Sequence, residues 1–376
     1  MLITEIEALE LRVPGWDASG LDGSYDTCLV RIHTDEGVIG ISETDSLPGI
    51  IRSIINANPS HTGARGLGEL LIGQDPSDIE GLWKQMYEGT FYIGRRGVVI
   101  HAISAIDIAL WDLKGKIENK TIAELLGRPK RDRILAYGTV YPLGRTTNEV
   151  KINIDRGLKR GLKAIKIVAD PHWNEDVKHT ENLIRTAREH VGHDIKLMCD
   201  AATAWTKAKQ GLPFLPVFKE CNFEWLEAPL PLDDIEGHAE FVGHGIPITG
   251  GDLGLTTCHE YRQILDYGKV DIVQPDISMM GGLTEFKKLC KMVRVRNRRL
   301  VTHGYKTNIT IAMNLNVLSQ HWTEEPLEYS TSESPLRWTL TNESFEVGSD
   351  GKVLCPKGPG LGVSLNLEAI ERFSVA

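Results

Sequence analysis

The chain has 376 residues, of which 41% are hydrophobic and 25% are charged, and it carries a formal net charge of −9 at pH 7. A chain of this length suits about two folded domains and can bury a large core without disulfide or metal staples. It has no basic stripe, which argues against a nucleic-acid partner, and no run approaches the ~20 apolar residues of a membrane span.

The cysteines and the first residues bear on the cellular compartment. The six cysteines are scattered without a C-x-x-C pair, and several lie in apolar runs. The opening MLITEIEALELRV alternates like a strand and lacks the basic start and long apolar stretch of a signal peptide. We therefore expect reduced thiols and a cytoplasmic protein.

The first part of the chain, residues 1–125, has the pattern of an α+β domain. Strand patterns at Thr4–Val13 and Cys28–Thr34 precede a series of helical patterns. The helical segment His101–Lys116 places its apolar residues on one face, as a core-facing helix does. Between the two strands, residues 15–25 are rich in glycine and polar residues, which predicts a mobile loop.

Residues 130–339 alternate between strand and helix patterns, for example in the helical stretches Glu175–His190 and Leu283–Arg296. Eight strands with seven intervening helical segments predict an α/β barrel. The predicted strands are 134–141, 164–169, 196–201, 223–228, 247–252, 270–275, 299–303 and 326–330. The last segment, about 340–376, contains no further unit of this kind, and we expect it to pack back against the first domain.

Six acid–base side chains recur in this region at intervals of 24 to 27 residues, close to the length of one strand–helix unit. Each ends or follows a short apolar run. They are Asp200, Glu227, Asp252, Asp276, His303 and Glu328. Because a barrel places its catalytic groups at the carboxyl ends of its strands, the spacing predicts that these side chains share one rim.

The first three, Asp200, Glu227 and Asp252, are carboxylates on successive strand ends. Such groups repel one another unless a cation lies between them. Hard oxygen ligands suit Mg²⁺, and the lack of His or Cys at these positions argues against zinc. The simpler alternative, three acidic helix N-caps, does not explain why all three fall in register.

Asp276 and His303 follow on the next two strands. A carboxylate on one imidazole nitrogen orients the ring and raises its basicity, which leaves the other nitrogen free to act as a general base. Lys166, near the end of the second strand, is expected to neutralise a bound carboxylate or to act as a base. Glu328 ends the eighth strand, and crowding by other carboxylates predicts that it keeps its proton and donates to a developing enolate oxygen.

These residues carry a resemblance to a known family. The motifs LMCDA, WLEAPLP, ITGGD, DIVQPDISMMGG, VTHG and LEYSTS, preceded by SAIDIALWDLKGK and AIKIV, resemble the enolase superfamily and its mandelate-racemase-like subgroup over nearly the whole chain. The resemblance implies a modified (β/α)7β TIM barrel and an N-terminal capping domain completed by the C-terminal tail. It also implies Mg²⁺ at Asp200, Glu227 and Asp252, the Asp276–His303 dyad, Glu328 beside the enolate oxygen, and a homo-oligomer.

Two positions depart from the family pattern. The third metal ligand is usually Glu, whereas this chain has Asp252. The racemases carry K-x-K on the second strand, with the second lysine acting as a base on the other face of the substrate, whereas this chain has Lys166-Ile167-Val168. A reaction with His303 as its one base is therefore favoured, and the stretches FYIGRRG and LPLDDIEG resemble acid-sugar dehydratases of the rhamnonate-dehydratase type.

The expected activity is Mg²⁺-dependent dehydration of a small-molecule sugar acid to a 2-keto-3-deoxy acid. The alternative is an epimerase, racemase or lactone cycloisomerase with a second acid or base, for which Tyr141 and His172 are candidates. A binding protein without chemistry would not need Asp276, His303 and Glu328 together. Tyr305 joins the candidates for protonating the leaving group. The residues expected to contact the substrate are Trp16, Tyr25, Arg52, Tyr92, Tyr141, His172 and Lys306.

Overall fold

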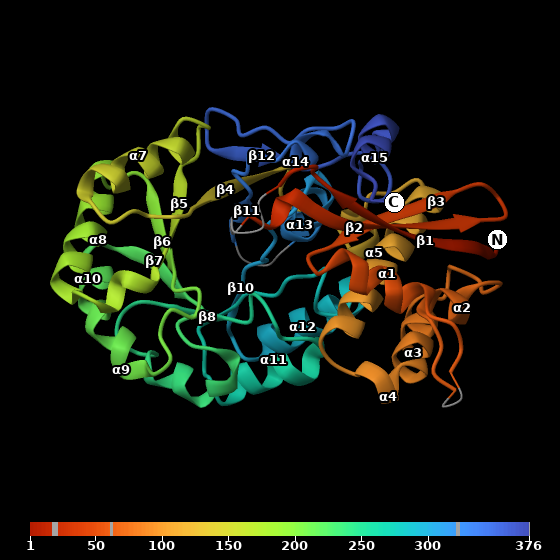
Figure 1. Cartoon of the computed structure of the whole chain (residues 1–376), viewed down its shortest axis with the longest axis horizontal. Coiled ribbons are helices and arrows are strands. Elements are labelled where there is room, and N and C mark those ends of the chain that lie inside the picture. The colour runs from red at the N-terminus through yellow and green to blue at the C-terminus, as the bar shows by residue number, and fades with distance from the viewer. Residues whose placement is uncertain (17–21, 61–62, 321–323, 376) are drawn as a thin grey trace.

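The computed structural model of the chain describes residues 1–16, 22–60, 63–320 and 324–375. Two sheets organise these residues: an antiparallel sheet of three strands near the N-terminus and a larger, curled parallel sheet (Figure 1). Both chain ends lie on the same side of the molecule, beside the N-terminal sheet (Figure 1). Residues 17–21 of the loop that we expect to be mobile lie outside the described residues.

The N-terminal sheet has the order β1–β2–β3 and is covered by helices. The central helix is α5, in which 16 of the 21 residues are buried. It packs so closely on β3 that a side chain at Gly40 would collide with the backbone of Ala109. The strands are β1 (Ile3–Arg12), β2 (Asp26–Thr34) and β3 (Ile39–Thr44), and the helices are α1 (Pro48–Asn56), α2 (Leu67–Leu71), α3 (Ile79–Gly89), α4 (Phe91–Gly94), α5 (Val98–Glu118) and α6 (Ile122–Leu126).

The parallel sheet contains all eight predicted strands, in the order β10–β9–β8–β7–β6–β5–β4–β11. The last strand therefore lies beside the first, as a barrel requires, while β10 and β11 are not hydrogen-bonded to each other among the described residues. The strands are β4 (Arg133–Val140), β5 (Ala164–Val168), β6 (Lys196–Asp200), β7 (Phe223–Glu227), β8 (Ile248–Gly250), β9 (Ile272–Val273), β10 (Arg299–Leu300) and β11 (Leu327–Tyr329). Their near-continuous apolar sequences fit strands that are buried on both faces.

Seven helical segments connect these eight strands, as the sequence predicts for a (β/α)7β barrel. The α-helices are α7 (Thr147–Leu158), α8 (Val177–Val191), α9 (Ala208–Gly211), α10 (Leu215–Glu220), α11 (Thr257–Asp266), α12 (Gly282–Val295) and α13 (Asn308–Gln320). Short 3-10 helices occur at Gly23–Tyr25, Pro171–Asn174, Leu212–Phe214, Leu232–Asp234 and Glu236–Glu240, and the last two form the connection between β7 and β8.

The C-terminal tail contacts both the barrel and the N-terminal sheet. It contains α14 (Pro335–Thr339), β12 (Lys352–Leu354) and α15 (Leu367–Phe373). Strand β12 pairs with β4 of the barrel, whereas the residues after α15 return to β1, where Val375 N donates to Glu10 O at 2.9 Å. Figure 1 shows α15 beside the N-terminal sheet. The domain boundaries, 1–125 with about 340–376 and 130–339, stay a prediction.

Two simpler features of the described residues complete the fold. All six cysteines are free, as expected, and Cys28, Cys199, Cys221 and Cys258 are buried. No described helix is long and apolar enough to cross a membrane.

Candidate active site

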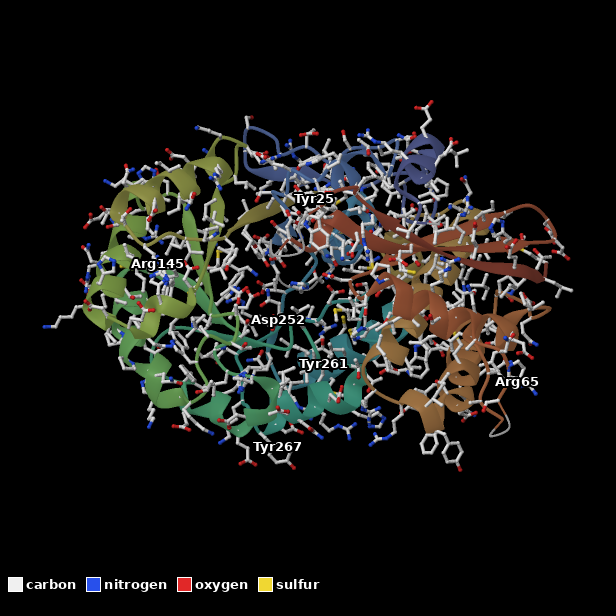
Figure 2. All side chains as sticks on the ribbon, in the orientation of Figure 1. Tyr25, Arg65, Arg145, Asp252, Tyr261 and Tyr267 are labelled. Atoms are coloured by element: carbon white, nitrogen blue, oxygen red, sulfur yellow. The ribbon has the colours of Figure 1, made fainter. Side chains whose placement is uncertain are left out.

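The barrel strands bring the predicted side chains to one rim. Asp200 and Glu227 are direct partners in the pairing of β6 and β7, and a parallel bridge joins Asp276 to His303 just beyond β9 and β10. Lys166, Asp200, His303 and Glu328 line a cavity of about 450 Å³ at this end of the barrel. Figure 2 shows Asp252 near the middle of the molecule, and Tyr25 where the N-terminal sheet meets the barrel.

A layer of barrel-interior side chains lies under this rim. Tyr137, Ala164, Met198, Trp225, Ile272 and Val301 form a separate buried cluster contributed by six strands or strand ends. The rings of Tyr137 and Trp225 meet edge to face at 5.6 Å, and Lys166 Nζ lies 5.5 Å from the centre of the Tyr137 ring. The cluster closes the barrel below the polar groups, so their charges are held in a region of low dielectric constant.

Lys166 is the cation at the centre of the rim. Its Nζ lies 2.6 Å from Glu227 Oε1, 2.8 Å from Glu328 Oε1 and 3.6 Å from Asp200 Oδ2. Burial alone would lower the pKa of Lys166, but Glu227 and Glu328 outweigh it and raise the pKa well above its usual value. The side chain is therefore an ammonium that binds carboxylates, which fits the first of its two expected roles.

The carboxyl groups of the rim outnumber its basic groups. Burial, with the charges of Asp200 and Glu328, raises the pKa of Glu227 to about 8 although Lys166 opposes the shift. Burial and the charge of Asp200 raise the pKa of Asp252 to about 6. Glu227 Oε2 also accepts hydrogen bonds from Trp225 Nε1 at 3.2 Å and Gln274 Nε2 at 3.0 Å.

The predicted metal ligands have the chemistry that a hard divalent cation needs. Asp200, Glu227 and Asp252 offer only oxygen donors, which are the ligands that Mg²⁺ prefers in proteins. In this arrangement, however, Lys166 donates to Glu227 Oε1, while Glu227 Oε2 accepts from Trp225 and Gln274. Among the described residues, the ligand atoms that converge within 4.8 Å of one another belong to a different group, Asp45, Asp276 and His303.

The Asp276–His303 pair has the geometry of an oriented imidazole. His303 Nδ1 lies 2.9 Å from Asp276 Oδ2, and Nε2 lies 3.7 Å from Glu328 Oε2. Asp276 Oδ1 accepts hydrogen bonds from Ser278 N at 2.7 Å and Ser278 Oγ at 2.6 Å. Burial would lower the pKa of His303, but the charges of Glu328 and Asp276 outweigh it and raise the pKa to about 10.

The expectation that Glu328 keeps its proton is wrong for this arrangement. Burial would raise the pKa of Glu328, but Lys166 and His303 outweigh it and lower the pKa to about 2. Thr139 Oγ1 at 2.8 Å and Gly304 N at 3.2 Å also donate hydrogen bonds to the carboxylate. The prediction considered neighbouring carboxylates, whereas the nearest charged groups are two cations.

The predicted substrate-contacting residues divide into two sets. Tyr141 lines the cavity, and Tyr25 lines an adjoining cavity of about 1030 Å³ together with Tyr141 and Tyr305. Trp16 stacks on Tyr25 with ring centres 5.8 Å apart. Among the described residues, the lining of the first cavity does not include the other four, Arg52, Tyr92, His172 and Lys306.

Each residue of the second set has a clear location. Arg52 is exposed on α1, and Tyr92 on α4 is 87% exposed. His172 is buried on the 3-10 helix Pro171–Asn174, which follows β5. Lys306 is also buried, and its Nζ lies 3.3 Å from Asp45 Oδ1 and 3.5 Å from Asp26 Oδ1 and donates to Gly23 O at 2.5 Å. Lys306 therefore ties the barrel to the N-terminal domain.

One charged residue of the cavity was not predicted from the sequence. Asp45 follows β3 of the N-terminal sheet and lines the cavity next to His303. A polar residue at the end of a buried strand was the available signal, but β3 lies outside the repeating barrel units that defined the rim.

Comparison with known proteins identifies the family of the chain. Residues 8–127 match the model of the mandelate racemase / muconate lactonizing enzyme N-terminal domain, and residues 149–370 match the enolase C-terminal domain-like model. The chain belongs to the enolase superfamily. It is therefore an enzyme with the (β/α)7β barrel and N-terminal domain of that superfamily.

Several named relatives can be aligned with most of the chain. D-galactarolactone cycloisomerase of Agrobacterium fabrum is 30% identical over 361 residues, which are 92% of this chain and 90% of the relative. L-rhamnonate dehydratase of Saccharopolyspora erythraea is 30% identical over 91% of this chain and 84% of its own. The solved structure of a racemase from Streptomyces coelicolor with bound magnesium covers 100% of both chains with a TM-score of 0.85 and 26% identity.

Proposed function

We propose that the enzyme dehydrates a sugar acid to a 2-keto-3-deoxy acid, with His303 as the base that removes the proton from C2. The observation that carries this proposal is the Asp276–His303 pair, in which Asp276 holds Nδ1 and Nε2 is directed to the side of the rim where Glu328 lies. The likeness to L-rhamnonate dehydratase supports the substrate class.

Asp200, Glu227 and Asp252 would hold Mg²⁺ beside Lys166. When bound, Mg²⁺ supplies positive charge that offsets the negative charge developing on the substrate carboxylate as the α-proton leaves. The bound magnesium in the similar Streptomyces coelicolor structure supports this assignment. Lys166, held as an ammonium, contributes further positive charge to the same carboxylate.

One residue, His303, is sufficient for both proton transfers of the dehydration. Neutral His303 accepts the C2 proton at Nε2, while Asp276 stabilises the imidazolium that forms. The electrons of the broken C–H bond then form the C2–C3 double bond and expel the 3-hydroxyl group. That group takes the proton back from Nε2 and leaves as water, and the resulting enol becomes the 2-keto acid. With a pKa raised to about 10, His303 carries a proton near neutral pH in this arrangement and must release it before it can act as the base. A divalent cation held by the neighbouring carboxylates would lower that pKa and favour the neutral imidazole.

A second base on the opposite face is not needed for this reaction. Lys166 is bound to carboxylates, and position 168, where the racemases carry their second lysine, holds Val168. Tyr141 and Tyr305 both line the cavity, and Tyr141 is a predicted candidate for an acid on that face. If Tyr141 acts in this way, the enzyme is a cycloisomerase, which the likeness to D-galactarolactone cycloisomerase also supports.

A screen of aldonic and aldaric acids with Mg²⁺ in D₂O separates these activities. We expect one or more acids to yield a 2-keto acid, detected by its reaction with semicarbazide. A product without a keto group but with deuterium at C2 would favour the cycloisomerase or an epimerase. The absence of both products from every acid tested would contradict the proposal.

A further inference from the structure

Asp45 is the carboxylate that the N-terminal domain brings to the active-site cavity. It lies just after β3, and its side chain is 20% exposed, which is more than that of any buried rim residue. One of its oxygens lies within 4.8 Å of ligand atoms of Asp276 and His303. A charged group is thus fixed beside the proposed base, although it belongs to neither the dyad nor the predicted metal ligands.

The position of Asp45 is determined by contacts with the barrel. Its backbone N–H donates to Ser278 Oγ at 3.0 Å, and the same hydroxyl donates to Asp276 Oδ1 at 2.6 Å. On the preceding residue, Thr44 Oγ1 donates to Ser278 O at 2.8 Å. The backbone of Asp45 and the carboxylate of Asp276 are therefore held by one serine, which sets the distance between Asp45 and the dyad.

The charge of Asp45 is held by Lys306. Lys306 Nζ lies 3.3 Å from Asp45 Oδ1, and the neighbouring charges of Asp45 and Asp26 raise the pKa of Lys306 despite its burial. The structure records no hydrogen bond from the described residues to the second oxygen, Asp45 Oδ2. An ionised carboxylate can only accept hydrogen bonds, so a partner in the cavity must be a donor.

The hydroxyl groups of a sugar acid are such donors. The hydroxyl on C3 is an unsuitable partner, because it gains negative charge as it leaves and a nearby carboxylate would oppose its departure. We propose that Asp45 accepts a hydrogen bond from one hydroxyl of the substrate chain beyond C3, and that it thereby selects the configuration at that carbon. This inference rests on the proposed function, because it assumes a polyhydroxy acid in the cavity.

The test compares two alanine variants on substrates that lack single hydroxyls. Asp45→Ala and Asp26→Ala each remove one carboxylate partner of Lys306, but Asp26 is not among the described residues that line the cavity. The substrates are the acid that the screen identifies and its 4-deoxy and 5-deoxy analogues. Thermal unfolding of both variants establishes that they fold, and Asp45→Asn replaces Asp45→Ala if the latter does not.

Asp45→Ala should lower kcat/KM for the full substrate by about 10- to 100-fold, the range for a hydrogen bond to a charged group. With one deoxy analogue, that loss should shrink to less than about threefold, because the hydroxyl that Asp45 binds is already missing. Asp26→Ala should change kcat/KM by less than about threefold on all three substrates.

Two results would overturn the inference while leaving the dehydratase intact. One is an equal loss from Asp45→Ala on all substrates, which would mean that Asp45 acts on His303 rather than on a hydroxyl. The other is an equal loss from Asp26→Ala, which would mean that Asp45 only holds Lys306. A wild-type enzyme that gives neither keto acid nor C2 deuterium from any acid would remove the proposed function and this inference together.

Discussion

The molecule buries carboxylates in two regions, and their partners differ. At the barrel rim, Glu227 and Glu328 share one ammonium and lie close to other charged groups. Between the N-terminal domain and the barrel, Glu43 Oε1 accepts hydrogen bonds from the backbone and hydroxyl groups of Thr307 and Thr310, at 2.8 to 3.0 Å, where α13 begins. Asp107 Oδ2 likewise accepts from Thr284 N at 3.0 Å, near the start of α12.

The difference separates a reactive buried acid from a structural one. Glu43 satisfies the free N–H groups at the start of a helix, so its charge is balanced by fixed dipoles. At the rim, side-chain cations balance the carboxylate charges, and burial raises the pKa values of Glu227 and Asp252. Burial of an acid therefore does not by itself indicate chemistry, and the two regions differ in whether side-chain cations or helix N–H groups balance the charge.

Removal of divalent cations should have the largest effect on activity. Treatment with EDTA should abolish keto-acid formation, by on the order of 10³-fold or more, because the rim carboxylates leave the substrate carboxylate without enough positive charge. Added Mg²⁺ should restore turnover. The chelated protein should still unfold cooperatively in a thermal melt, because the carboxylates between the domains do not depend on the metal. Full activity after exhaustive chelation would contradict this prediction.

Glu328→Gln should affect activity more than stability. The substitution removes the carboxylate that lies 2.8 Å from Lys166 Nζ and 3.7 Å from His303 Nε2, so both side chains lose the charged partner that positions them. We expect kcat to fall by about 10²-fold. The matched control is Glu43→Gln, an equally buried site, which should leave kcat within about threefold of wild type. If the two variants lose the same activity, the distinction between the regions fails.

Glu43→Ala should affect stability more than activity. The loss of the acceptor leaves the N–H groups of Thr307 and Thr310 without this partner at the start of α13. We expect the free energy of unfolding to fall by about 2–4 kcal/mol, measured by urea denaturation. A change below about 0.5 kcal/mol would show that water replaces the carboxylate without cost.

Asp107→Asn should change stability alone, and by an amount that depends on pH. Burial raises the pKa of Asp107 to about 7, although hydrogen bonds from Thr284 oppose the shift. Between the unfolded pKa near 4 and the folded value, the folded state keeps a proton that the unfolded state releases, so the free energy of unfolding falls as pH rises. The limit is about 1.4 kcal/mol per pH unit.

Urea denaturation of wild type and Asp107→Asn from pH 4.5 to 7.5 measures this contribution. The difference between the two proteins should change with pH over that window and level off above it. A difference that is constant with pH would mean that Asp107 is already ionised in the folded protein.

The sequence predicts the fold and the rim well because both depend on a local period. Each strand–helix unit places its terminal polar residue at the same end of the barrel, so the positions of Asp200 to Glu328 follow from spacing alone. The charges of these residues do not follow, because they depend on which groups meet across the rim. Glu328 is the example: its partners Lys166 and His303 are known only from the folded arrangement.

The period of the strand–helix units does not predict the contacts between the N-terminal domain and the barrel. Thr44 and Ser278 are 234 positions apart, and no repeat relates β3 to the loop after β9. The location of Asp45 beside the dyad and the burial of Lys306 both depend on this docking. Arg52 and Tyr92, which were expected to contact the substrate from segments of the N-terminal domain, are not among the described residues that line the cavity.

The most direct test of the central claim is His303→Asn in D₂O with the sugar acid that the wild-type enzyme uses. Asparagine keeps a polar side chain of similar size but cannot accept the C2 proton as an imidazole does. We predict that removal of the C2 proton, measured as formation of the keto acid, falls by at least about 10³-fold while the thermal unfolding temperature stays within a few degrees. A folded variant that still removes the C2 proton at the wild-type rate would show that His303 is not the base.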